Sequence, residues 1–175
     1  MTEDFKKSLK FVFKWENVYN KKGEVIATND PDDPGGVTKY GIDQRSNPGV
    51  DVANLTEQQA AELYWKEWLD CRAGELPFPL SMAYFDGVVN TGPSQGTKFL
   101  QRAVGAKDDG VLGPKTLASA KDACEKRGVE SVARAVCSAR DRFYIYLVEQ
   151  KPKFSKFKTG WLRRVSDLSK EVSKK

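Results

Sequence analysis

The chain has 175 residues, of which 39% are hydrophobic and 30% are charged, values typical of one folded globular domain. It contains no histidine. This excludes Ser-His-Asp and Cys-His catalysis, His-ligated zinc sites and imidazole general bases, so any proton chemistry must come from carboxylates, Lys, Tyr or Cys.

The predicted elements begin with an amphipathic helix over about residues 3–16, in which apolar residues recur at helical spacing from Phe5 to Phe13. Glu16 continues this apolar stripe, and a carboxylate on such a face is costly unless it is paired or protonated. Residues 17–50 lose the helical period and are rich in glycine and proline, which predicts a small irregular β-hairpin lobe.

Helices account for most of the remaining chain. Thr56 and Gln59 form a capping-box pattern, which predicts a helix that ends near Leu69. Further helices are expected over about 78–90, 93–104, 114–128 and 129–150, and from about Trp161 onward. The predicted fold is therefore mainly α (α+β), one domain over 1–175 with a small β lobe after the first helix.

Charge is unevenly distributed along the chain. Residues 151–175 carry nine Lys or Arg against Asp167 and Glu171, a net charge of +7, whereas the other 150 residues have a net charge of −2. A basic segment of this kind suits a polyanionic partner such as nucleic acid, anionic lipid or an anionic wall polymer, and a solvated lysine-rich tail is the alternative. Its basic residues do not follow the arrangement of a known nucleic-acid reader, so no nucleic-acid partner is expected.

Cys71, Cys124 and Cys137 are odd in number and lack zinc-ligand spacing, so we expect free, mostly buried thiols in a protein made in a reducing compartment. No apolar run approaches the length of a signal peptide or a membrane span. We therefore expect synthesis as a cytoplasmic protein, without a metal or other cofactor.

Candidate catalytic groups gather in the first 45 residues. Glu16 ends an apolar helix, and the pKa of a carboxyl in an apolar environment rises, as a general acid requires. The turn NDPDDPGG that precedes Thr38 supplies carboxylates that stay ionised and can activate water or stabilise positive charge. Glycosidic bond cleavage uses such a pair of carboxyl groups. The alternative is a salt bridge for Glu16 and a purely structural turn.

A calcium loop is a competing interpretation of that turn, because Asp30, Asp32 and Gly35 are spaced as in an EF-hand. Pro34 and Gly41, however, stand at positions where an EF-hand supplies ligands.

Arg140 interrupts the long apolar stripe of the 129–150 helix. An arginine that faces a core needs an acidic partner. Glu16 is one candidate, and this pair would join the last long helix to the first. A local pair with Asp141 or Glu149, or a snorkelling stem, is the alternative.

Six motifs together resemble glycoside hydrolase family 108, the lysozyme-like muramidases of bacteria and phages. WENVY (15–19) and DPGGVTKYGI (33–42) are similar to the N-terminal signature of that family. The likeness continues through FDGVVNTGP (85–93) and LQRAVG (100–105). DGVLGPKTL (109–117) and GWLRRV (160–165) resemble the peptidoglycan domain usually fused to that N-terminal half.

The resemblance implies a lysozyme-superfamily fold, with a catalytic part over about 1–92 and a helical, peptidoglycan-binding-like part over about 93–175. It also implies hydrolysis of the β-1,4 bond between N-acetylmuramic acid and N-acetylglucosamine. Glu16 maps onto the general acid. Asp33 and Thr38 would position or activate the water, with Asp32 as an equally spaced competitor to Asp33.

Three further residues are expected to contact the substrate: Tyr19, Tyr40 and Asn90. One departure from the family pattern concerns the residues after the glutamate. The family usually reads Glu-Gly-Gly-Tyr, where glycines allow a tight turn or close approach of the backbone, and here Asn17 and Val18 replace both glycines.

The leading hypothesis is a monomeric muramidase of the phage endolysin type, which reaches the wall after a holin-type lesion opens the membrane. Its partners would be peptidoglycan and, through the basic C-terminus, an anionic wall or outer-membrane surface. A lytic transglycosylase that acts on the same bond is one alternative. A non-catalytic peptidoglycan-binding module on a degenerate lysozyme scaffold is another.

Overall fold

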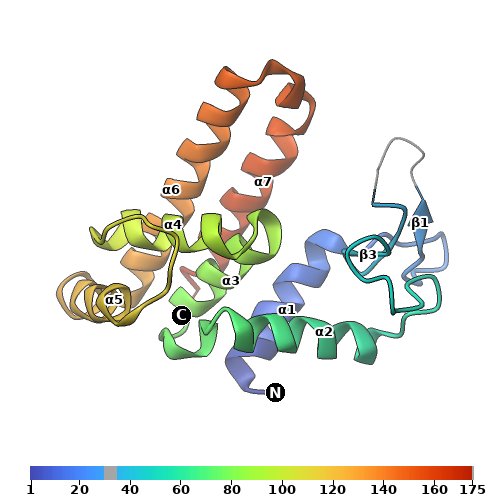
Figure 1. Ribbon diagram of the computed structural model, residues 1–175, viewed down its shortest axis with the longest axis horizontal. Helices are drawn as coiled ribbons and strands as arrows, with labels where there is room; N and C mark the ends of the chain where they lie inside the picture. Colours follow the sequence, from blue (N-terminus) through green and yellow to red (C-terminus); the bar gives the residue numbers. More distant parts are fainter. Residues whose placement is uncertain (30–34, 175) are drawn as a thin grey trace. The chain divides into compact units, whose positions relative to one another are not determined.

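The computed structural model describes residues 1–29 and 35–174 and is mainly helical, as predicted (Figure 1). The chain divides into two compact units. Leu9–Glu67 and Met1 form the first unit, and Thr2–Ser8 together with the chain from Trp68 onward form the second. The expected division near residue 92 stays a prediction.

Helix α1 (Glu3–Glu16) has the bounds that the apolar period predicts. It starts at a polar cap, because the Phe5 N–H donates to Thr2 Oγ1 over 3.3 Å. Val12 and Phe13 are buried, so the predicted stripe faces a core. The stripe carries Glu16 on the last turn of the helix.

The predicted β lobe is a three-stranded antiparallel sheet in the order β1-β2-β3. Its strands are short: β1 is Thr28–Asn29, β2 is Val37–Lys39 and β3 is Ile42–Asp43. Tyr40 and Gly41 form the two-residue turn between β2 and β3, with φ values of 57° and 77°. Positive φ at both central residues matches the twist of a hairpin and is characteristic of a type I′ turn.

Helix α2 (Glu57–Asp70) begins at the predicted capping box. The Gln59 N–H donates to Thr56 Oγ1 over 3.2 Å, and the Thr56 N–H donates to Gln59 Oε1 over 2.9 Å. Farther along the helix, the buried Tyr64 packs edge-on against Phe13 at 5.8 Å between ring centroids. This contact joins α2 to α1 within the first unit.

The second unit is a helical assembly around α3 (Leu80–Thr91), whose residues 80–88 are all buried. A short 3-10 turn, η1 (Ala73–Glu75), precedes it. The later elements are α4 (Pro93–Val104), α5 (Pro114–Arg127), α6 (Val129–Gln150), η2 (Pro152–Phe154) and α7 (Ser155–Glu171). Helices α6 and α7 pack side by side as a hairpin that η2 closes (Figure 1).

One predicted boundary is wrong: α7 begins at Ser155, six residues before the expected start at Trp161. Pro152, Thr159 and Gly160 weaken the helix signal of this stretch. Phe157 stacks on Trp161 at 5.6 Å, however, and this contact stabilises the first turns of the helix.

The three cysteines are free thiols, as predicted, and Cys71 and Cys137 are buried. Burial raises the pKa of the Cys137 thiol to about 12. Among the residues that the structure describes, no helix is both long enough and apolar enough to cross a bilayer.

Candidate active site

Glu16 ends α1 directly beside the β2–β3 turn of the first unit. A Cβ atom placed on Gly41 would lie 2.8 Å from both Cβ and Cγ of Glu16. Real Cβ atoms essentially never come so close, so the glutamate stem occupies space that only glycine at position 41 leaves open. The hairpin turn therefore confines the side chain of the predicted general acid.

Tyr64 supports the same turn from α2. Its hydroxyl donates to the carbonyl oxygen of Tyr40 over 2.9 Å, and both rings are buried. The Tyr64 hydroxyl oxygen would lie 2.7 Å from a Cβ on Gly41, so it shares the space beside the turn with the stem of Glu16. The sequence does not identify Tyr64, because its place on an apolar helix face indicates only burial. The hydrogen bond from its hydroxyl to Tyr40 joins residues 24 positions apart.

Thr38 lies on the central strand of the sheet, where Thr28 and Asp43 are its cross-strand partners. Residues directly opposite each other point to the same face of a sheet, so these three side chains form a polar row. Asp43 Oδ1 accepts the Ser46 N–H over 2.8 Å and thereby fixes the turn after β3. Asp43 was not a predicted site residue. Its position in the hairpin that follows Thr38 could have indicated that the two side chains lie on the same face of the sheet.

Asp33 and its competitor Asp32 lie outside the residues that the structure describes, as does Asp30 of the possible calcium loop. The described residues contain no group of three or more His, Cys, Asp or Glu side chains suited to a metal ion. The assignment of Asp33 as the second carboxylate therefore stays a prediction.

The two tyrosines expected to contact substrate lie in different environments. Tyr19 is 54% exposed and follows Glu16 closely in the chain, whereas Tyr40 is only 8% exposed. The Tyr40 ring packs against Phe13 at 5.5 Å. Burial raises the pKa of Tyr40, and the negative charge of Glu57 adds to the effect. The first unit thus offers Tyr19 as an accessible ring and uses Tyr40 as part of its packing.

Asn17 and Val18 fit the backbone without strain. The described non-glycine residues with positive φ are Tyr40 and Arg72, so positions 17 and 18 need no glycine conformation. The Asn17 N–H continues the helical pattern to the Phe13 carbonyl, and its side-chain amide donates to the Tyr19 hydroxyl over 3.3 Å. The departure from Glu-Gly-Gly-Tyr therefore leaves the glutamate and the tyrosine in an ordinary local geometry.

Arg140 belongs to a buried ionic cluster of the second unit. Its Nη1 lies 2.5 Å from Oδ2 of Asp86, whose Oδ1 lies 2.7 Å from Nη2 of Arg164. Although burial opposes ionisation, the guanidinium groups of Arg164 and Arg140 hold the pKa of Asp86 below its usual value. The structure thus gives Arg140 an acidic partner other than Glu16, Asp141 or Glu149.

The same cluster extends to Asn90, one of the expected substrate contacts. Arg140 Nε donates to the Tyr144 hydroxyl over 3.0 Å, and that hydroxyl donates to Asn90 Oδ1. Arg140 Nη2 has no hydrogen-bond partner among the described residues. Pairing of Arg140 with Glu16, and contact of Asn90 with substrate, stay predictions.

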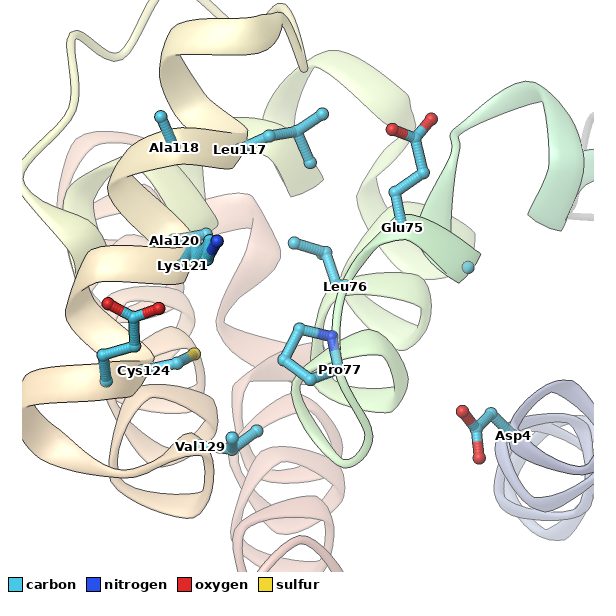
Figure 2. A pocket seen from close by; sticks show the side chains of 12 residues that line it. Asp4, Glu75, Leu76, Pro77, Leu117, Ala118, Ala120, Lys121, Cys124 and Val129 are labelled. Atoms are coloured by element: carbon cyan, nitrogen blue, oxygen red, sulfur yellow. The ribbon is translucent and has the colours of Figure 1, made fainter.

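A groove of about 820 Å³ lies elsewhere in the second unit. Figure 2 shows Leu76 and Pro77 on one side and Leu117 and Ala120 of α5 on the other. None of the described residues that line it is a predicted catalytic or substrate-binding residue. The described lining of this groove therefore shares no residue with the constellation around Glu16.

Residues 9–92 match the family described as "Glycosyl hydrolase 108", and residues 95–166 match the "Predicted Peptidoglycan domain". Among solved structures, "Structure of Brucella abortus SagA" matches with a TM-score of 0.75 and 28% sequence identity. The match covers 96% of this chain and 92% of that one. No curated protein matches the chain.

The mainly helical architecture with a small β lobe fits a lysozyme-like α+β fold, as the resemblance implied. Peptidoglycan is the polymer that the second domain indicates as substrate or partner. The chain thus matches the glycosyl hydrolase 108 model over its first half and the predicted peptidoglycan domain over its second, and the two matches together support a glycoside hydrolase that acts on peptidoglycan.

Proposed function

We propose that the protein is a muramidase that hydrolyses the β-1,4 bond between N-acetylmuramic acid and N-acetylglucosamine. The observation that carries this proposal is the position of Glu16 at the end of α1, confined by Gly41 of the hairpin turn within the glycosyl hydrolase domain. A general acid must be held in a productive geometry, and a turn that fixes the stem of the glutamate provides this.

In the proposed mechanism, protonated Glu16 donates its proton to the glycosidic oxygen as the bond from that oxygen to the anomeric carbon breaks. Asp33 accepts a proton from a water molecule, and Thr38 helps to hold that water. The water oxygen then bonds to the anomeric carbon, so one water is consumed for each bond cleaved. The polar row formed by Thr28, Thr38 and Asp43 supports this role for Thr38, because it supplies hydroxyl and carboxylate groups to which a water can hydrogen-bond.

The first experiment measures release of reducing ends from purified peptidoglycan by wild type, Glu16→Gln, Asp33→Asn and Asp43→Asn. Loss of a general acid typically costs about 10²- to 10⁴-fold in rate, so Glu16→Gln is expected to lose nearly all activity. Near wild-type activity in Glu16→Gln would refute the proposal.

The two aspartate variants are a matched pair. Asn at position 43 can still accept the Ser46 N–H, so Asp43→Asn preserves the turn and removes only the charge. A large loss in Asp33→Asn with a small loss in Asp43→Asn supports the assignment of Asp33. The reverse result would move the role of second carboxylate to Asp43.

A lytic transglycosylase would use one glutamate without a hydrolytic water and would leave a 1,6-anhydro sugar. Mass spectrometry of the released muropeptides separates the two reactions, because the anhydro product is lighter by one water. Hydrolysis predicts the heavier product, and a predominance of anhydro ends would replace the muramidase proposal with the transglycosylase.

We further propose that the enzyme is a monomeric endolysin, made in the host cytoplasm and released to the wall through a holin-type lesion. The buried, free thiols of Cys71 and Cys137 support folding in a reducing compartment. Expression in a bacterial host with and without a holin tests this role. Lysis is expected only with the holin, and lysis without it would contradict the proposed route.

A further inference from the structure

The end of the α6–α7 hairpin concentrates positive charge. We call residues 151–161 the hairpin tip. Its four basic side chains are Lys151, Lys153, Lys156 and Lys158, and no acidic residue occurs between positions 150 and 166. Three of these lysines are exposed and Lys158 is half-buried. Among the described residues, none of the four forms an ion pair with a carboxylate.

The hairpin tip also exposes an aromatic ring on a rigid support. Tyr144 is buried, and its ring stacks on Trp161 with 4.8 Å between centroids and an interplanar angle of 20°. Trp161 in turn stacks on Phe157 at 5.6 Å and 28°. Phe157 is 44% exposed. A ladder of three rings therefore leads from the core of the second unit to solvent.

Charge and aromatic surface are interleaved on this tip. The ammonium group of Lys153 lies 5.3 Å from the centroid of Phe154, and that of Lys156 lies 4.9 Å from the centroid of Phe157. Phe154 lies 6.5 Å from Phe157, so the two pairs are neighbours. The surface offers apolar rings flanked by flexible cationic heads.

We propose that the hairpin tip binds the surface of an anionic phospholipid bilayer. Lysines attract lipid phosphate groups without a fixed geometry, and each contributes about 1 kcal/mol near an anionic surface. Aromatic rings insert at the boundary between headgroups and acyl chains, as the apolar side of interfacial helices does. Phe157 supplies the aromatic ring, and Lys153 and Lys156 supply positive charge close to it.

A bilayer fits this tip better than a polysaccharide chain does. Recognition of sugar hydroxyls requires several fixed donors and acceptors, and the tip presents mainly lysine charges on flexible stems beside Phe157, an exposed ring without a polar group. The inference is independent of the proposed muramidase reaction, because it involves no residue of the Glu16 constellation.

The test measures co-sedimentation of the full chain with vesicles of phosphatidylcholine alone or mixed with phosphatidylglycerol. Wild type is expected to bind the anionic vesicles, to bind neutral vesicles weakly and to lose binding at high salt. Since one lysine is worth about fivefold in partitioning, Lys153→Ser/Lys156→Ser should weaken binding about 25-fold. Phe157→Ser should weaken binding to the same vesicles while keeping the salt dependence.

Lys115→Ser/Lys121→Ser is the matched control, since both lysines are exposed on α5 of the same unit. It removes the same charge and should bind like wild type. Equal losses in the control and tip variants would reduce the effect to net charge and overturn the proposal. Unchanged vesicle binding in the tip variants, together with weaker binding to purified peptidoglycan, would make the tip a wall-binding surface instead.

Two further measurements keep this inference separate from the proposed function. Glu16→Gln should bind vesicles like wild type even though it is expected to lose peptidoglycan cleavage. Circular dichroism and cleavage of soluble peptidoglycan fragments by the tip variants should match wild type. A tip variant that fails both measurements has lost its fold, and Phe157→Tyr, which keeps the ring, then tests whether an aromatic contact restores binding.

Discussion

In the first unit, the strands are two or three residues long, and a turn with two positive φ values touches the candidate catalytic glutamate. In the second unit, helices of 12 to 22 residues enclose a carboxylate shared by two arginines. The proposed activity thus depends on a few close contacts around Glu16 in the first unit. The stability of the second unit depends on a buried ionic cluster enclosed by long helices. Substitutions in the two units should therefore fail in different ways.

Removal of the Asp86 carboxylate should produce the largest effect on stability. Asp86→Ala leaves the buried guanidinium groups of Arg140 and Arg164 without their counter-charge, and breaking a buried pair in this way costs about 3–5 kcal/mol. Urea denaturation measures the loss. Asp108→Ala is the control, because its pair with Arg102 is exposed and worth less than about 1 kcal/mol. Equal losses would show that the cluster adds nothing beyond a surface pair.

Acid should weaken the same cluster in a predictable direction. Because the pKa of Asp86 is lowered in the folded state, its ionised form stabilises the fold above the unfolded pKa of about 3.9. That stabilisation is lost as pH falls through the folded pKa. The free energy of unfolding of wild type should therefore fall more steeply below pH ~4 than that of Asp86→Asn. Parallel curves would contradict the assignment.

Gly41→Ala should damage activity more than stability. The added methyl group would lie 2.8 Å from the stem of Glu16, and displacement of a catalytic group by about 1 Å can cost about 100-fold in rate. Gly36→Ala is the matched control, since Gly36 has φ +73° and no atom of the described residues lies within 4 Å of the added group. Both variants carry a backbone cost of roughly 1–2 kcal/mol.

Comparison of the two glycine variants separates the contacts that a methyl group at position 41 would make, with Glu16 and the Tyr64 hydroxyl, from the backbone cost that both variants share. Reducing-end release should fall about 100-fold in Gly41→Ala and remain near wild type in Gly36→Ala, at a temperature where both stay folded. If both lose activity equally, the loss comes from strain in the lobe, and Gly41 has no particular role beside the glutamate.

Tyr64→Phe should have a smaller, mainly structural effect. It removes the donor to the Tyr40 carbonyl and leaves a buried acceptor unpaired, which costs about 1–3 kcal/mol. The turn that confines Glu16 then loses one support, so activity should fall less than in Gly41→Ala. Thermal unfolding and reducing-end release measure the two effects. A fall in activity larger than that of Gly41→Ala would give the Tyr64 hydroxyl a more direct role.

Local patterns in the sequence predicted the elements that depend on neighbouring residues. The apolar period gave the bounds of α1, and the Thr56–Gln59 pair gave the start of α2. The late start predicted for α7 was wrong because ring stacking of Phe157 on Trp161 overrides the weak helix signal of Thr159 and Gly160.

Contacts between distant residues were beyond the reach of these patterns. Arg140 was expected to need an acid, but its partner Asp86 lies 54 residues away on another helix, where its neighbours read as an apolar core. Gly41 could be identified as a turn residue, whereas its contact with Glu16 depends on how α1 packs on the sheet. Sequence could therefore predict the β lobe that follows Glu16, but not the packing that confines the glutamate, and the catalytic role of Glu16 stays a prediction.

Restoration of the family glycines after Glu16 should have the smallest effect. Positions 17 and 18 do not adopt positive φ, so Asn17→Gly/Val18→Gly gains no relief from strain and adds chain entropy to the unfolded state. Each glycine should cost about 0.5–1 kcal/mol, and the Asn17–Tyr19 hydrogen bond is lost as well. Thermal unfolding should show lower stability, while reducing-end release stays within about twofold of wild type. A marked gain in activity would mean that the side chains of Asn17 and Val18 obstruct the substrate. Access to Glu16 would then depend on the two residues after it as well as on Gly41.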